Sequence, residues 1–131
     1  MTNTTYKHAL ALNPCFEGGT AVMGAFPPTG LEYIAASLKD EVEKVTVLDL
    51  RYEPTCRDPK TLSELIRTEG IDLLCISVSW HSHFRSTCEF IAQLPPEVTT
   101  VVGGHTATVE VESLLAQCPN IDMVARGEGE E

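Results

Sequence analysis

With 131 residues, of which 43% are hydrophobic, the chain has the size and composition of one compact domain with its own core. Its formal net charge of −10 disfavours nucleic acid and anionic membrane surfaces as partners. No apolar run approaches the roughly 20 residues that cross a bilayer, and residues 1–7 are too polar to begin a secretion signal, so we expect a cytoplasmic location.

The first predicted elements are a strand, a long loop and a helix. Residues 7–12 form a short apolar strand, which residues 13–15 break. The loop that follows extends to about Thr29, and its many glycines and prolines prevent a regular element. A loop of this length in a small domain is usually functional. Thr29 and Glu32 have the spacing of a capping box and predict the start of a helix, whose apolar face consists of Leu31, Ile34, Ala35 and Leu38.

Strands and helices then alternate to the end of the chain. A strand is predicted over residues 44–49, and Asp58 with Pro59 starts a helix that ends at Gly70 and turns Leu62, Leu65 and Ile66 inward. The nearly continuous apolar run at residues 73–78 is typical of a central strand covered on both faces. The remaining elements are a helix at about 82–93, a strand at 99–102, a helix at about 109–117 and a short strand at 121–125.

This alternation without hairpin signals predicts an α/β fold, a Rossmann-like (flavodoxin-like) doubly wound sheet of five parallel strands in the order 2-1-3-4-5. Ligands of such sheets bind beyond the carboxyl ends of the strands, at the switch point between the first and third strands. Unusual sequence follows four of the strands, at residues 13–30, 79–83, 103–106 and 126–129. We therefore expect the site at this edge of the sheet.

The glycine pair at the end of the fourth strand permits two interpretations. Gly103 and Gly104 remove two β-carbons where a ligand could approach the main chain, but they would equally suit a tight turn into the next helix. Ser77, in the third strand, either offers a hydroxyl to a ligand or bonds a neighbouring carbonyl. The residues alone leave both questions open.

The cysteines and histidines give no clear metal site. No two of the five cysteines have the close spacing of a metal knuckle, so we expect reduced, mostly buried thiols. His81 and His83 could hold a metal, although solvated or hydrogen-bonded imidazoles are the simpler interpretation. His105 is better placed for a polar cofactor contact. Trp80 could stack on a ligand or only pack in its loop.

Five motifs spread along the chain carry a family resemblance. They are Pro27-Pro28-x-Gly30-Leu31, Val-Leu-Asp49, Ile-Ser77, Val-Gly103-Gly104-x-Thr106-Ala107-Thr108 and Arg126-Gly127-Glu128-Gly129-Glu130. In this order they resemble the amino-terminal cobalamin-binding domain of cobalamin-dependent radical S-adenosylmethionine enzymes, in the branch that includes the oxygen-independent magnesium-protoporphyrin ester cyclase. The whole chain, residues 1–131, would then be one cobalamin-binding domain.

The resemblance implies a corrinoid ring at the sheet edge with its nucleotide tail beside the sheet. The residues that it places at the cofactor are Phe26, Pro27, Gly30, Ser77, Ser79, Trp80, Gly103, Gly104, His105, Thr106, Gly127 and Glu128. Methyl-carrying domains of the methionine synthase type have Asp-x-His-x-x-Gly before the first helix. Here Ala25 and Pro27 stand at the Asp and His positions, so the resemblance implies base-off cobalt without a histidine ligand.

The chain lacks the Cys-x-x-x-Cys-x-x-Cys motif that holds the four-iron four-sulfur cluster of radical enzymes. We therefore expect a binding module that is not catalytic by itself, with the cluster and S-adenosylmethionine in a catalytic domain supplied in cis or in trans. The alternative is a flavodoxin-like regulatory or protein-interaction domain without a cofactor. Asp49 could instead suggest the ribose ligand of a dinucleotide site, but no Gly-x-Gly-x-x-Gly follows the first strand.

Overall fold

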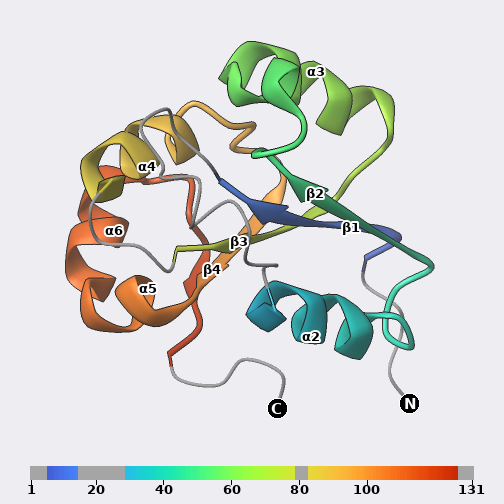
Figure 1. Cartoon of the computed structure of the whole chain (residues 1–131), viewed down its shortest axis with the longest axis horizontal. Helices are drawn as coiled ribbons and strands as arrows, with labels where there is room; N and C mark the ends of the chain where they lie inside the picture. Colours follow the sequence, from blue (N-terminus) through green and yellow to red (C-terminus); the bar gives the residue numbers. More distant parts are fainter. Residues whose placement is uncertain (1–5, 15–28, 79–82, 127–131) are drawn as a thin grey trace.

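A computed structural model describes residues 6–14, 29–78 and 83–126. The elements, in chain order, are β1 (His8–Asn13), α2 (Thr29–Leu38), β2 (Lys44–Asp49), the 3₁₀ helix η1 (Pro54–Arg57), α3 (Pro59–Thr68), β3 (Leu73–Ser77), α4 (Phe84–Ile91), β4 (Thr99–Gly103), α5 (His105–Val109), α6 (Val111–Gln117) and β5 (Met123–Val124). The strands form one parallel sheet in the order β2-β1-β3-β4-β5 (Figure 1). This confirms the predicted α/β fold and strand order. None of the described helices has the length and apolar content needed to cross a bilayer.

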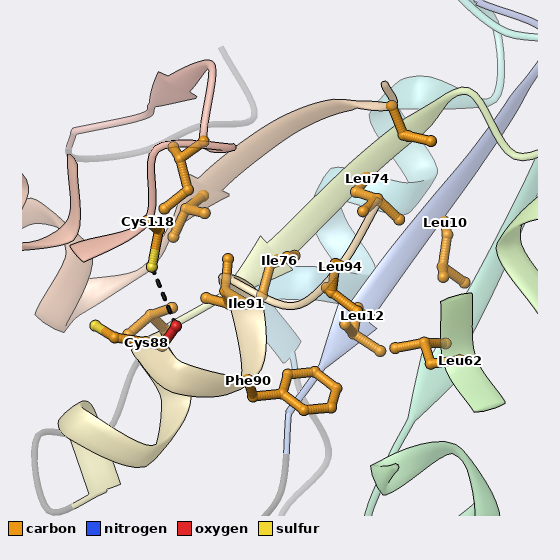
Figure 2. Close-up of a cluster of buried hydrophobic side chains, with 14 of the residues drawn as sticks. Leu10, Leu12, Leu62, Leu74, Ile76, Cys88, Phe90, Ile91, Leu94 and Cys118 are labelled. Atoms are coloured by element: carbon orange, nitrogen blue, oxygen red, sulfur yellow. Dashed lines mark hydrogen bonds between the residues drawn. The ribbon is translucent and has the colours of Figure 1, made fainter. Parts of the chain in front are cut away.

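The two faces of the sheet are covered differently. Helices α3, α4 and α6 pack on one face and enclose the larger core, where Leu74 and Ile76 of the central strand are almost completely buried (Figure 2). Helix α2 lies on the other face (Figure 1), where its Leu31 and Ala35 contact the small Ala11. Each large side chain fully buried in the core contributes about 1.5–3 kcal/mol to folding. The larger core therefore supplies most of the apolar stabilisation.

Two aspartates close the amino edge of the sheet, and both follow a buried isoleucine. The carboxylate of Asp72 accepts hydrogen bonds from the backbone N–H groups of Lys7 (2.9 Å) and His8 (2.9 Å) at the start of β1. Asp122 does the same for the N–H of Thr100 in β4, at 2.8 Å. Each aspartate also donates its own N–H to the neighbouring strand. Backbone donors that would otherwise be unpaired at the strand starts are thereby satisfied.

Local sequence signals placed the element ends to within about two residues, as for α4 and β5, which are shorter than the predicted 82–93 and 121–125. Asp58 caps α3 by accepting from the N–H of Lys60, and Gly70 follows that helix with φ 68°. The prediction of a break at Asn13 was wrong, because this residue is the last of β1. Helix α2 already includes Thr29, the expected cap. The structure also adds η1, which the sequence reading did not predict.

Helix α5 is a further element that the sequence did not predict. Its residues include the β-branched Thr106, Thr108 and Val109, which have low helix propensity. Tertiary contacts compensate, because the carbonyl of Val78 after β3 accepts hydrogen bonds from the N–H groups of Thr106 (3.0 Å) and Ala107 (3.2 Å). The helix start therefore depends on β3 and not on a local cap.

The four described cysteines are free thiols, and Cys15 lies outside the described residues. Cys88 and Cys118 are buried side by side, and the Cys118 thiol donates to the Cys88 carbonyl at 3.2 Å (Figure 2). Burial raises the pKa of Cys118 to about 12 and that of Cys75 to about 11. These thiols are therefore protonated at neutral pH and chemically inert.

Candidate functional site at the carboxyl edge of the sheet

The strand register aligns five residues in one row across the carboxyl edge of the sheet. From β2 to β5, this edge row consists of Asp49, Asn13, Ser77, Gly103 and Ala125. Asp49 pairs with Asn13 and Ser77 pairs with Gly103. The two pairs are joined because Leu12 pairs with Ile76, one residue before Asn13 and Ser77. A β-carbon at Gly103 would lie 3.6 Å from that of Ala125. Alternate residues of a strand share a face, so the row lies on the face that α2 covers.

The half of the edge row on β3 to β5 has no large side chain. Ser77 already interacts with another group of the protein, so its main contribution here is its small size. Gly103 is half-buried and does not have a positive φ. A β-carbon there would be in ordinary contact with Ala125 and no other described residue, so the backbone does not need glycine at this position. Among the described residues, only Ala125 lies within 4 Å of the position that a side chain at Gly103 would occupy first.

Gly104 has a different role from its neighbour. Its φ of 111° and ψ of 174° belong to a region that residues with a side chain rarely adopt. The sharp turn from β4 into α5 therefore requires glycine here, as the turn interpretation predicted. The N–H of Val78 bonds the Gly103 carbonyl at 2.7 Å, which holds this turn against the end of β3.

The other half of the edge row is a polar network. The Asp49 carboxylate accepts hydrogen bonds from Nδ2 of Asn13 (3.1 Å) and from Nε and a terminal nitrogen of Arg51 (3.0 and 2.7 Å). Burial alone would raise the pKa of Asp49, but the hydrogen bonds from Arg51 and Asn13 bring it below its ordinary value. The guanidinium of Arg57 donates to the carbonyls of Leu50 and Arg51, which fixes the backbone of the segment directly after β2.

This network gives Asp49 a role that the sequence did not indicate. Arg51 occupies both of its oxygens, so Asp49 is poorly suited to the ribose of a dinucleotide. Sequence reasoning had not proposed Asn13 as a site residue. The only signal was that Asn13 and Asp49 are polar residues at the ends of two predicted strands, which is too common a pattern to single them out.

The described site residues gather where β3 ends and β4 turns into α5. Ser77 and Gly103 lie in the edge row, and Gly104 forms the turn. His105 is exposed at the start of α5, whereas Thr106 is only 3% exposed. Gly30 lies in the first turn of α2. Six predicted site residues lie outside the described residues: Phe26, Pro27, Ser79, Trp80, Gly127 and Glu128.

A groove with a volume of about 640 Å³ lies near the β5 end of the edge row. It is lined by residues 108–113, which join α5 to α6, and by Arg126, which follows Ala125.

Of the two histidines considered for a metal, His81 lies outside the described residues. His83 precedes α4, and its carbonyl accepts a hydrogen bond from the Thr87 hydroxyl at 2.8 Å.

Comparisons with known proteins point to one family. Residues 19–131 match the B12 binding domain family. The anaerobic magnesium-protoporphyrin IX monomethyl ester cyclase of Cereibacter sphaeroides is 28% identical over 119 residues, which cover 87% of this chain and 19% of the cyclase. The cyclase of the same name from Synechocystis is 32% identical over 113 residues, which cover 79% of this chain and 21% of that cyclase. The hopanoid C-3 methylase of Methylococcus capsulatus is 30% identical over 115 residues, which cover 85% of this chain and 22% of the methylase. The chain thus spans about a fifth of the length of these relatives.

Proposed function

Because the chain belongs to the B12 binding domain family, we propose that it binds a corrinoid at the carboxyl edge of its sheet. The ring lies over the ends of the strands, and the nucleotide tail lies along the small half of the edge row, formed by Ser77, Gly103 and Ala125. The observation that carries this placement is Gly103, because neither its φ nor its described neighbours require a glycine. A flat group can therefore approach the backbone there.

The ring contacts come from segments that leave the same edge. Gly30 in the first turn of α2 and the exposed His105 at the start of α5 are suitably placed for the ring periphery. Ser79, Trp80, Gly127 and Glu128 complete this set on the strength of the family resemblance. Thr106 completes the set on the family resemblance as well; its side chain is buried, and its backbone N–H donates to the Val78 carbonyl.

The lower face of the cobalt lies near Phe26 and Pro27 and receives no histidine. This proposal is supported by the sequence, in which Pro27 stands where a ligating histidine is found in methyl-carrying domains. The bound corrinoid is therefore base-off. His105 is delivered by the segment after β4 and not by the segment before α2, so it does not replace the missing ligand.

We infer that this chain serves a catalytic radical domain. The relatives named as a cyclase and as a methylase are about five times longer than the region matched here, which leaves room for such a domain. That domain would hold the four-iron four-sulfur cluster and S-adenosylmethionine, either in cis or in trans. When bound, the corrinoid supplies a methyl carrier or a redox centre. The residues of this chain bind and orient it and do not react.

Retention of hydroxocobalamin tests the proposal. The purified protein, mixed with the corrinoid and desalted, should keep close to one equivalent of the pink chromophore, because the slot is formed by backbone and small side chains. Circular dichroism checks that the protein is folded. Complete loss of the colour from folded protein at micromolar concentration would refute corrinoid binding.

Electron paramagnetic resonance of the cobalt(II) form tests the lower face. We expect no nitrogen superhyperfine triplets, in wild type or in His105→Ala. Triplets that disappear in a single histidine variant would refute the absence of a histidine ligand. Triplets that persist in those variants but disappear with cobinamide would show that the tail base remains coordinated, which refutes the base-off state while leaving corrinoid binding intact.

A further inference from the structure

The polar half of the edge row fixes the orientation of one amide group. An ionised carboxylate only accepts hydrogen bonds, so the Asn13 group that faces Asp49 must be the amide nitrogen. Arg51 keeps Asp49 charged with a salt bridge of 2.7 Å, and the two side chains are only 16% and 14% exposed. The reverse amide orientation would place two acceptors against each other. The Asn13 amide is therefore locked.

A locked amide nitrogen leaves the amide oxygen available on the other side. Oδ1 of Asn13 must lie on the side of the amide away from Asp49. Asn13 and Ser77 are the next residues after the paired Leu12 and Ile76, so Ser77 is the neighbour of Asn13 on the other side of the row. Within residues 6–14, 29–78 and 83–126, no recorded donor bonds this oxygen. The backbone of Asn13 is also fixed, because its carbonyl accepts from the N–H of Leu50 at 3.0 Å. A rigid, neutral acceptor therefore borders the open part of the row.

We propose that Asn13 is a corrinoid-binding residue whose Oδ1 accepts a hydrogen bond from a neutral N–H or O–H donor of the cofactor. Asp49 and Arg51 act as positioning residues that hold the amide in this orientation. The inference rests on the proposed function, because the donor must belong to the corrinoid bound at the same edge. Corrinoids carry suitable donors in two places, the primary amides around the ring and the hydroxyls of the nucleotide tail.

Titration of two asparagine variants with hydroxocobalamin tests this role. Asn13→Ala should raise the Kd roughly 3- to 10-fold, the loss expected for one hydrogen bond. Asn120→Ala is the matched control, because Asn120 also donates through Nδ2, to the Ile91 carbonyl at 2.8 Å, but lies in the turn that precedes β5. This control should change the Kd by less than about 2-fold. An unchanged Kd in Asn13→Ala, or equal losses in both variants, would refute the inference.

A double-mutant cycle separates positioning from general loosening. Asp49→Asn should weaken binding by a factor similar to Asn13→Ala, because the amide is no longer forced into one orientation. In the Asn13→Ala background, Asp49→Asn should have no further effect on the Kd. Independent, additive losses would show that Asp49 acts on binding without Asn13. Thermal unfolding without corrinoid records the stability cost of each variant separately.

Cobinamide, which lacks the nucleotide tail, identifies the donor. If Asn13→Ala weakens binding of both corrinoids, the donor is a ring amide, whereas a loss confined to hydroxocobalamin places it in the tail. Either result supports the inference. If wild-type protein binds neither corrinoid, the proposed function itself fails. If wild type binds and Asn13→Ala binds equally well, only the role of Asn13 is lost.

Discussion

The two edges of the sheet differ in what surrounds the ends of the strands. At the amino edge, the carboxylates of Asp72 and Asp122 accept hydrogen bonds from backbone N–H groups near the starts of β1 and β4, so these donors are satisfied within the protein. At the carboxyl edge, Ser77, Gly103 and Ala125 leave a floor without large side chains, beside a polar network that holds Asn13. The first edge is therefore suited to stability and the second to binding.

This contrast shows that residues of one kind serve different purposes at the two edges. Asp72 and Asp122 at the amino edge accept hydrogen bonds from backbone N–H groups at the starts of other strands. Asp49 at the carboxyl edge accepts from the side chains of Asn13 and Arg51, and from the backbone N–H of Arg51 in its own segment. Positions 70 and 104 require glycine because their φ angles are positive, whereas Gly103 does not have a positive φ and is not required by the backbone. Substitutions at matched positions should consequently separate folding from corrinoid binding.

The largest expected effect on binding is that of Gly103→Val. Its branched side chain would fill the space over the edge row, and we expect the Kd for hydroxocobalamin to rise roughly 10- to 100-fold. The fold should persist, because valine suits a strand and the nearest β-carbon would be 3.6 Å away. Thr99→Val, on the same strand and face but at the amino edge, is the control. Loss of folding in Gly103→Val, with Thr99→Val intact, would contradict the assignment of Gly103 to binding.

Gly104→Ala should act first on stability. Its φ of 111° is strained for alanine, so we expect a loss of about 1–3 kcal/mol in the free energy of unfolding, measured by urea denaturation without corrinoid. Gly70→Ala, at φ 68° near the amino edge, provides a second strained position away from the site. It should lower stability without changing the Kd. A fully stable Gly104→Ala protein would show that the turn tolerates a side chain.

Asp72→Ala should lower stability with little effect on binding. The variant leaves the N–H groups of Lys7 and His8 without their carboxylate, at an expected cost of about 1–2 kcal/mol, because the bond from Lys7 is exposed and the bond from His8 is partly buried. The Kd for hydroxocobalamin, measured below the unfolding temperature, should stay within about 2-fold of wild type. A larger change in Kd would mean that the two edges are coupled through β1.

The smallest expected effect is the acid dependence of the Asp49 network. The pKa of Asp49 is lowered from its ordinary value of 3.8, so its contribution is present above that pH and is lost as the pH falls through the folded-state pKa. The stability difference between wild type and Asp49→Asn should be under about 1 kcal/mol, constant from about pH 5 to 8, and smaller below about pH 4. A difference that grows on acidification would contradict this sign.

Much of the fold could be predicted because its signals are local. Strand and helix periodicity reports which side of an element is buried, and Asp58 and Gly70 mark the two ends of α3 through bonds within a few residues. The parallel sheet then followed from alternation and the usual handedness of crossovers, whereas the order 2-1-3-4-5 was predicted as the flavodoxin-like one and is confirmed by the strand pairing. Local signals failed at α5, whose start depends on the Val78 carbonyl in a different element.

The candidate site, like the fold, was predictable only in part from local sequence signals. The sequence by itself predicted the carboxyl edge of the sheet as the site, because unusual sequence follows four of the predicted strands, and the family resemblance added Ser77 and Gly103 to the expected contacts. Only the tertiary structure separated Gly103 from Gly104, since φ angles and neighbours cannot be read from two adjacent glycines. It alone brought Asn13 to Asp49, 36 positions away. Strand register decides which residues stand side by side, and register depends on packing across the whole sheet and not on any one segment.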